Sequence, residues 1–225
     1  MRAIFPKFSC LILLAASTWF CRAEVKPNAL FSDGAVLQRG MAVPVWGTAR
    51  DGEKVTVTFN GQTVSTTATN GRWLVRLKPM KAGGPFTMTI AGDNSITLND
   101  ILVGEVWLCS GQSNMEFPLA RAANASEVIP TAGDAQLRLF TVPHGAANEP
   151  RTELTGRWKE SAPETVTNFS AVAWFFGRDL RKALKVPVGL IHSSVGGTPA
   201  EAWTARATLE ADPELKQILE RYAES

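Results

Sequence analysis

The segment WLCSGQSNME, residues 107–116, decides how the second half of this chain is organised. An apolar, strand-like segment from Ile101 to Leu108 leads into it, and a helix-competent stretch follows Ser113. Gly111 permits a tight turn between the two, because glycine readily adopts positive φ. A serine at a strand-to-helix turn stands where an open α/β sheet presents its chemistry. Ser113 is therefore the candidate nucleophile; the alternative is that this serine only caps a helix.

A nucleophilic serine needs a base, and the whole chain holds two histidines, His144 and His192. Cys109 lies close to Ser113 and is a second candidate nucleophile. Its place at the end of an apolar strand favours buried packing over catalysis.

A second glycine block, GLIHSSVGGTPAEAW, covers residues 189–203. Gly196 and Gly197 follow a predicted strand at 186–191 and precede a predicted helical turn. Glycines there expose backbone N–H groups that can point at an oxyanion forming near Ser113. A tight turn that merely needs glycine explains the pair equally well. Because the carboxyl ends of parallel strands share one sheet edge, we expect the two blocks to lie together.

The first part of the chain, residues 24–99, reads as all-β. Residues 55–59 alternate apolar and polar, and Asn60-Gly61 and Asn70-Gly71 are strong hairpin signals. Short strands separated by turn signals predict a small β-sandwich. The expected strands are 43–46, 55–59, 62–68, 72–77, 86–90 and 95–98.

From residue 101 the pattern changes to strand–helix alternation, which predicts a mainly parallel sheet covered by helices. Residues 137–142 read as a second strand of this part, and residues 170–184 as a helix. In that helix, Val172, Phe175, Phe176 and Leu180 lie near one face. The alternation provides only about three strands, whereas doubly wound domains commonly have five or six. This second domain, residues 100–225, is therefore expected to be an incomplete piece of a larger sheet.

Residues 1–23 read as a secretory signal peptide, with an uncleaved anchor as the alternative. Cleavage would remove three basic residues and no acidic one, so the formal charge would fall from +2 to −1. A near-neutral chain without basic clusters gives no reason to expect nucleic acid as a partner. Cleavage of the signal peptide would also leave Cys109 as the single cysteine, so no internal disulfide is expected. We expect an exported protein, periplasmic or extracellular, with no membrane contact after cleavage.

The two glycine blocks together resemble the sialate O-acetylesterase family, within the wider SGNH (GDSL-like) hydrolases. The likeness extends upstream to residues 37–39 and 45–47, and to the helix region 169–180. The resemblance implies a flavodoxin-like parallel-sheet hydrolase domain behind the β-sandwich. It also implies an O-acetylated carbohydrate as the substrate and no cofactor. No sequence pattern predicts a metal site.

The resemblance implies that Ser113 attacks an acetyl ester, and that the N–H groups of Ser113 and of Gly196 or Gly197 hold the oxyanion. It further implies a Gln-Gly-Glu-Ser block and a late Asp-x-x-His motif that supplies the base; neither occurs in these 225 residues. His192 falls inside a strand, and His144 matches no catalytic position of the family pattern. Glu116 either orients a neighbour or simply suits a helix N-terminus. The weaker substrate-binding candidates, for some of which helix packing is the alternative, are Gln112, Asn114, Glu201 and Trp203.

Three hypotheses follow from these residues. The first is a serine esterase that removes O-acetyl groups from sialic acid through an acetyl-enzyme. The second is a truncated, non-catalytic secreted protein that binds glycans, because loss of the histidine removes most of the activation of a serine. The third keeps the esterase chemistry but takes acetylated plant polysaccharide as the substrate.

Overall fold

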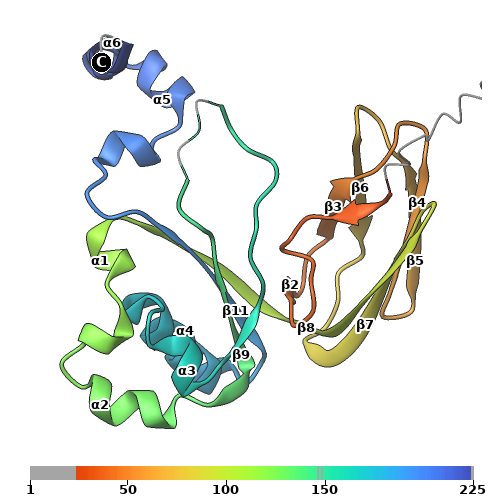
Figure 1. Cartoon of the computed structure of the whole chain (residues 1–225), viewed down its shortest axis with the longest axis horizontal. Coiled ribbons are helices and arrows are strands. Elements are labelled where there is room, and N and C mark those ends of the chain that lie inside the picture. The colour runs from red at the N-terminus through yellow and green to blue at the C-terminus, as the bar shows by residue number, and fades with distance from the viewer. Residues whose placement is uncertain (1–23, 146, 148, 224–225) are drawn as a thin grey trace, which may run out of the picture.

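The computed structural model describes residues 24–145, 147 and 149–223; the expected signal peptide lies outside them. An all-β part and a part with helices lie side by side, joined through strand β8 (Figure 1). The strands are β1 (Lys26–Pro27), β2 (Val36–Gln38), β3 (Val43–Thr48), β4 (Lys54–Phe59), β5 (Gln62–Thr67), β6 (Arg72–Leu77), β7 (Gly83–Ala91), β8 (Ser95–Gly111), β9 (Asp134–Thr141), β10 (Lys159–Ser161) and β11 (Val188–Ser194). The helices are α1 (Ser113–Glu116), α2 (Ala125–Val128), α3 (Pro163–Val166), α4 (Ala171–Leu184), α5 (Arg206–Ala211) and α6 (Pro213–Ala223), with 3₁₀ turns at Leu119–Arg121, Ile129–Thr131 and Ala200–Trp203.

The N-terminal strands form two sheets around one hydrophobic core. One sheet has the order β1-β3-β6; in the other, β5, β4, β7 and the first half of β8 are neighbours. The alternation of β4 places Val55, Val57 and Phe59 in the core, as expected from the sequence. Asn60 and Asn70 both adopt positive φ, 45° and 54°, which is the backbone that the two Asn-Gly hairpins require.

Strand β8 is a single 17-residue strand, where the sequence pattern predicted two separate strands at 95–98 and 101–108. Its first half pairs antiparallel with β7, and residues 105–111 pair parallel with β11. The predicted domain boundary at 99/100 therefore falls inside a continuous strand. The N-terminal core also takes in Phe140 and Trp158 from the second part, so the two parts pack directly against each other.

In the second part, β8, β11 and β9 are parallel neighbours, and β10 adds an antiparallel edge. In register, His192 of β11 lies opposite Cys109 of β8 and Thr141 of β9, so the three strands end at one edge of the sheet. Helix α4 covers this sheet, capped by the Ser170 hydroxyl, which accepts from the Ala173 N–H at 3.1 Å. The fold is thus a mixed α/β structure.

The buried face of α4 differs from the expected one. Ala173, Trp174 and Gly177 are buried, and a Cβ at Gly177 would lie 2.5 Å from a Leu190 methyl group. Val172 and Phe176 remain 49% and 41% exposed, so their predicted place on the core face is wrong. The close approach that Gly177 allows turns α4 toward β11 and away from those two side chains.

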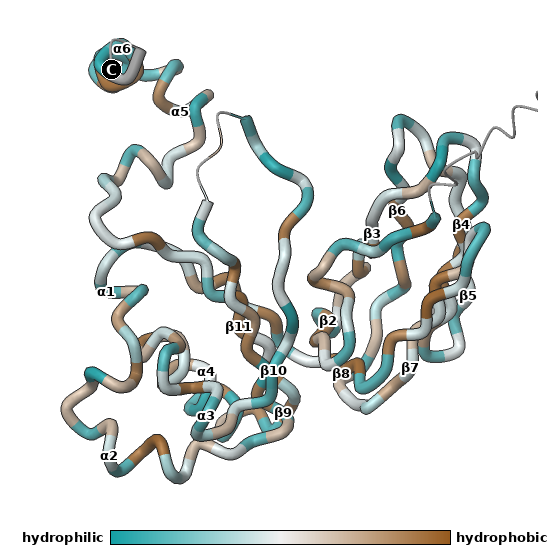
Figure 2. The backbone as a smooth tube through the Cα atoms, in the orientation of Figure 1, coloured by the Kyte–Doolittle hydropathy of each residue, from teal (hydrophilic) through white to brown (hydrophobic). Residues whose placement is uncertain are grey.

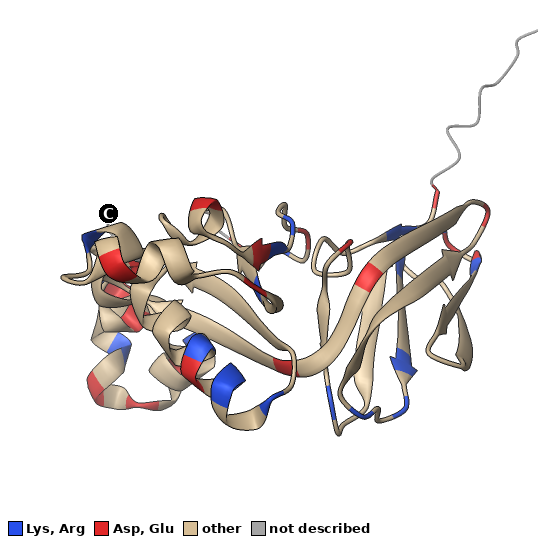
Figure 3. Cartoon of the chain, turned by 90° about the horizontal axis from the view of Figure 1, so that it is seen from below, with Lys and Arg blue, Asp and Glu red and all other residues tan. Residues whose placement is uncertain are grey.

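Hydrophobic segments and charged residues occur in both the all-β part and the part with helices. Hydrophobic segments run along the strands of both parts, whereas many connecting loops are hydrophilic (Figure 2). Acidic and basic residues both occur in each of the two parts (Figure 3). Within the described residues, no helix is long and apolar enough to cross a membrane.

Candidate active site

Ser113 is the first residue of α1, directly after the turn that ends β8. Gly111 has φ of 141°, a backbone that side-chain-bearing residues rarely adopt, and a Cβ there would lie 3.1 Å from Met115 Cγ. Gln112 serves as the helix cap. This local backbone places the Ser113 hydroxyl at the carboxyl edge of the parallel sheet, where ligands of such sheets bind.

The second glycine block reaches the same edge. Ser194, the last residue of β11, lies opposite Gly111, and the Val195 N–H donates to the Gly111 carbonyl at 3.0 Å. Gly197, with φ of 78°, directs its N–H at Ser113 Oγ, 3.4 Å away. The structure therefore brings together two turns that lie 84 residues apart in the sequence.

The Ser113 hydroxyl donates to the side-chain oxygen of Gln112 at 2.6 Å, and that oxygen also accepts from the Ser113 N–H at 2.8 Å. One of the expected oxyanion donors is thus engaged by Gln112. The predicted role of Gln112 was contact with substrate, but its contact in the structure is with the candidate nucleophile.

Glu116 binds the second glycine turn. Its Oε2 accepts from the Gly196 N–H at 2.5 Å, and a Cβ at position 196 would lie at the same distance from that oxygen. The N–H of Gly196 is therefore engaged by Glu116, and the N–H of Gly197 is the one that faces Ser113. The sequence left two roles open for Glu116, orienting a neighbour or suiting a helix N-terminus. Its contact with the Gly196 N–H corresponds to the first role.

His144, one of the two candidate bases in the sequence, has a contact at the site that the sequence did not predict. It lies in the loop after β9, yet its Nε2 lies 3.2 Å from Glu116 Oε1 and 2.9 Å from the Ser194 carbonyl oxygen. The sequence feature that could have indicated a place at the site is its position just after the predicted strand 137–142. The other site residues also follow the carboxyl ends of parallel strands. Its described contacts are with Glu116 and Ser194, so it supports the glycine turn and does not contact Ser113.

His192 is buried, only 6% exposed, with Nε2 2.5 Å from Ser194 Oγ and its ring packed edge-on against Phe169. Burial lowers the pKa of His192 below the ordinary value of 6.5, the nearby carboxylate of Glu116 partly opposes the shift, and the neighbouring His144 acts in the same direction as burial. His192 is therefore a neutral side chain of the sheet interior. Within the described residues, neither histidine is within hydrogen-bond reach of Ser113.

Cys109 behaves as a packed side chain. It is 7% exposed in the core beneath α4, and burial raises the pKa of its thiol to about 11. Because the thiolate is the nucleophilic form of cysteine, this thiol is unreactive at neutral pH. The packing interpretation from the sequence agrees with this environment.

The remaining predicted substrate contacts are Asn114, Glu201 and Trp203. The Trp203 indole donates to Thr198 Oγ1 at 2.8 Å, which ties the 3₁₀ turn to the glycine block. Glu201 lies in the same turn and is half-buried, whereas Asn114 is exposed on α1. None of these three residues lines the cavity that holds Ser113.

That cavity has a volume of about 500 Å³, in the range of small-molecule sites. Ser113, the two glycines, Phe117, Arg121 and Asn168 are among the residues that line it. Among the described residues, no cluster of three or more His, Cys, Asp or Glu side chains has a geometry able to hold a metal ion.

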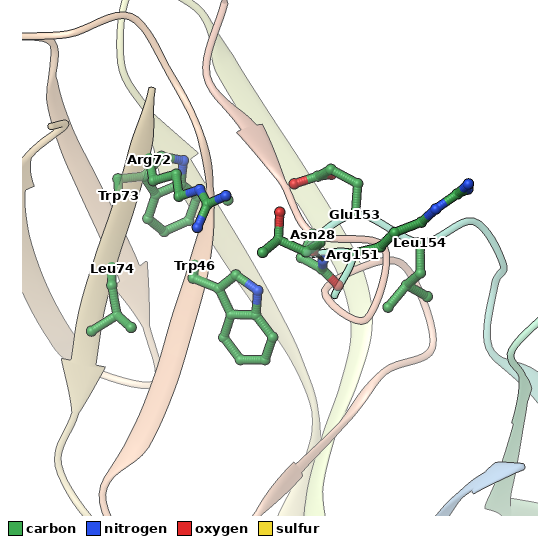
Figure 4. Close-up of a pocket in the computed structure, with 10 residues that line it drawn as sticks. Asn28, Trp46, Arg72, Trp73, Leu74, Arg151, Glu153 and Leu154 are labelled. Atoms are coloured by element: carbon green, nitrogen blue, oxygen red, sulfur yellow. Dashed lines mark hydrogen bonds between the residues drawn. The ribbon is translucent and has the colours of Figure 1, made fainter. Parts of the chain in front are cut away.

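A second cavity, about 530 Å³, lies between β3 and β6 on one side and residues 151–154 on the other. Trp46 and Leu74 project from the strands toward it, and Glu153 comes from the opposite segment (Figure 4). No predicted site residue lines it. The serine cavity is therefore the candidate active site.

A serine at the end of a parallel strand, facing a backbone N–H from a neighbouring turn inside a cavity, combines a candidate nucleophile with a candidate oxyanion donor, the pair of groups that serine hydrolases use. The known proteins that are similar to this chain carry esterase names. Sialate O-acetylesterase from Rattus norvegicus is 39% identical over 188 residues, which cover 74% of this chain and 35% of the relative. The Homo sapiens protein of the same name is 38% identical over 198 residues, covering 78% of this chain and 38% of the relative.

The crystal structure of a carbohydrate acetylesterase from Xanthomonas citri is also similar, with a TM-score of 0.80 and 41% identity. The match covers 83% of this chain and 43% of that one. No protein-family model matches the sequence. The resemblance to the sialate O-acetylesterases is thereby confirmed, and the chain spans between 35% and 38% of the length of the curated relatives.

Proposed function

We propose that the complete protein is a serine esterase that removes O-acetyl groups from sialic acid. The observation that carries this proposal is the position of Ser113 Oγ, in a cavity, 3.4 Å from the Gly197 N–H. The names of the curated relatives support sialic acid as the sugar. The proposal includes a β-sandwich module at residues 24–99, a hydrolase domain from residue 100, and export through the leader at residues 1–23.

In the proposed reaction, Ser113 Oγ attacks the acetyl carbonyl carbon and its proton passes to a base. The carbonyl oxygen becomes an oxyanion, which the Gly197 N–H stabilises; a donor of this kind contributes about 3–4 kcal/mol at comparable sites. The tetrahedral intermediate then expels the sugar oxygen, which takes a proton, and leaves an acetyl-enzyme. Water hydrolyses the acetyl-enzyme to acetate and free Ser113.

Two rearrangements accompany this reaction. The Ser113 hydroxyl exchanges its bond with Gln112 for one with the base, and the Ser113 N–H leaves Gln112 to join the oxyanion site. The base is supplied, in our proposal, by the Asp-x-x-His motif of the family pattern, because His144 and His192 contact other groups.

Ser113→Ala tests the enzyme proposal. The complete protein should release acetate from 9-O-acetylated sialic acid, and the variant should lose that activity by a factor of roughly 10³ or more. Ser110→Ala is the matched control, because Ser110 lies on β8 outside the serine cavity. Equal rates for wild type and Ser113→Ala would refute the proposal.

The absence of a base within reach of Ser113 in the described residues favours one alternative, a non-catalytic protein that binds glycans. Binding of O-acetylated sialic acid without acetate release, unchanged in Ser113→Ala, would establish this alternative. The Xanthomonas relative, titled a carbohydrate acetylesterase, keeps acetylated plant polysaccharide as the second substrate candidate. Faster acetate release from acetyl-xylan than from acetylated sialic acid would establish that substrate.

A further inference from the structure

Arg121 lines the same cavity as the candidate nucleophile and has no acidic partner among the residues that the structure describes. It ends the 3₁₀ turn Leu119–Arg121 and lines the cavity together with Gly196 and Gly197. Six other arginines form ion pairs, and Arg121 forms none with the described residues: the paired ones are Arg39, Arg50, Arg138, Arg178, Arg181 and Arg206. An uncompensated guanidinium beside a candidate nucleophile can bind an anionic group of a ligand.

The backbone that carries Arg121 is firmly held. Leu119 is fully buried, and its N–H donates to the Phe169 carbonyl at 2.9 Å. The Ala120 N–H donates to the Thr167 carbonyl at 3.0 Å. These bonds also place Asn168, between the two acceptors, in the wall of the cavity. The position of Arg121 relative to the glycine turn is therefore built into the fold.

The acidic residue of the cavity does not neutralise Arg121. Both carboxylate oxygens of Glu116 are engaged, one by the Gly196 N–H and the other by His144. The cavity thus presents a cation free for a ligand and a carboxylate that is already occupied. This asymmetry of charge favours an anionic ligand over a neutral one.

We propose that Arg121 is a specificity-determining residue that binds the carboxylate of an acidic sugar while the acetyl ester of that sugar lies at Ser113. The guanidinium fork matches a carboxylate with two parallel hydrogen bonds. A sialic acid carries such a carboxylate, whereas a neutral acetylated polysaccharide offers only hydroxyl and ether oxygens. The inference rests on the proposed function and gives a structural reason why the sugar is sialic acid.

The test compares two substrates and two proteins. The complete wild-type protein and its Arg121→Gln variant are assayed on O-acetylated sialic acid and on the methyl ester of that compound, which lacks the negative charge. Wild type should prefer the free acid by about 10–100-fold in kcat/KM, chiefly through KM, as expected for hydrogen bonds to a charged group. Arg121→Gln should hydrolyse both compounds at the rate that wild type shows for the methyl ester.

Arg121→Lys should keep part of the preference, because it retains the charge and loses the fork. Arg76→Gln is the matched control: Arg76 is an exposed residue of β6, with no ion pair to the described residues and outside the serine cavity. Arg121 is exposed and its side chain forms no hydrogen bond or ion pair with the described residues, so Arg121→Gln should also keep the wild-type melting temperature. The inference is overturned if Arg121→Gln slows both substrates equally, or neither.

Failure of the esterase proposal has a different signature. Wild type would then release no acetate from either compound. Saturation-transfer NMR with N-acetylneuraminic acid and its methyl ester measures binding without hydrolysis. Preferential binding of the acid by wild type and its loss in Arg121→Gln would support the role of Arg121 independently of catalysis. Equal binding of the two compounds by wild type would refute it.

Discussion

Gly111 and Gly197 are the two residues on which the surroundings of Ser113 depend most directly. Their φ values of 141° and 78° belong to backbone regions that disfavour a Cβ. Between them, Gly196 carries no Cβ that would meet the Glu116 carboxylate. Positive φ accounts for glycine at positions 111 and 197, and the close approach of the Glu116 carboxylate accounts for it at position 196. The same glycines are the clearest indication of the candidate site in the sequence.

The burial of Cys109 predicts a thiol that does not react in the folded protein. With a pKa of about 11, almost none of it is thiolate at neutral pH. Iodoacetamide labelling, located by peptide mass spectrometry, should leave Cys109 unmodified under native conditions and modify it fully in denaturant. Rapid native labelling of Cys109 would contradict the buried placement.

The lowered pKa of His192 predicts a loss of stability in acid. Below its ordinary pKa of 6.5, the unfolded chain binds a proton at this residue more readily than the folded protein does. The free energy of unfolding therefore falls as the pH drops from 6.5 toward the lower pKa of the folded state. Other acidic groups titrate in the same region, so the measurement is a comparison with His192→Asn.

Thermal unfolding between about pH 5 and pH 7.5 makes this comparison. The wild-type melting temperature should decline more steeply toward acid than that of His192→Asn. Parallel pH profiles for the two proteins would show that His192 titrates alike in the folded and unfolded states.

At the scale of elements, strands were predicted correctly where apolar–polar alternation or a neighbouring Asn-Gly hairpin turn defines them. The expected strands at 55–59, 62–68 and 72–77 correspond to β4, β5 and β6. The fusion of two expected strands into β8 was not predicted, because Asn99 and Asp100 read as a turn. Asp100 does take a positive φ of 57°, yet β7 and β2 pair with the strand on either side of that point. Long-range pairing overrode the local turn signal.

The segment between β9 and β10 is anchored to the N-terminal sheets by a buried side chain. Asn28 is 1% exposed; its amide donates to the Thr152 carbonyl at 3.0 Å, and its oxygen accepts from the Leu30 N–H at 3.1 Å. Asn28→Ala should lower the free energy of unfolding by about 1–3 kcal/mol, because it removes two part-buried hydrogen bonds to the backbone.

Chemical denaturation of Asn28→Ala and Thr152→Ala measures this effect. Thr152→Ala is the matched control, since only the backbone carbonyl of Thr152 takes part in the contact and its side chain is exposed. Equal stabilities for Asn28→Ala and wild type would show that the anchor does not contribute.

At the scale of the whole molecule, the parallel sheet has an open side. In the described residues, β11 pairs with one side of residues 107–111 of β8, and no strand pairs with the other. Trp107 and Leu108 are 44% and 67% exposed, and Trp107 packs on Phe176 with ring centroids 5.0 Å apart. Successive side chains of a strand point to opposite faces, so both faces of the sheet are incompletely covered beside this unpaired edge.

An unpaired apolar edge predicts self-association of this 225-residue chain. The apparent mass in size-exclusion chromatography with light scattering should rise with protein concentration. Leu108→Lys should suppress the rise, because a charge on an edge strand opposes pairing, whereas Lys54→Arg on β4 should not. A concentration-independent monomer mass for the wild-type chain would contradict this prediction.

Local chemistry alone was enough to locate Ser113, the two glycine turns and most strands. Each of these features depends on residues that favour positive φ, on apolar–polar alternation or on a helix cap. All three involve only a few neighbouring residues, so a short stretch of sequence is enough to predict them. The tertiary structure decided which groups meet: Glu116 with Gly196, His144 with Glu116, and Arg121 with the serine cavity. These contacts join segments up to 80 residues apart, and their positions follow from strand register and packing, which no local pattern encodes.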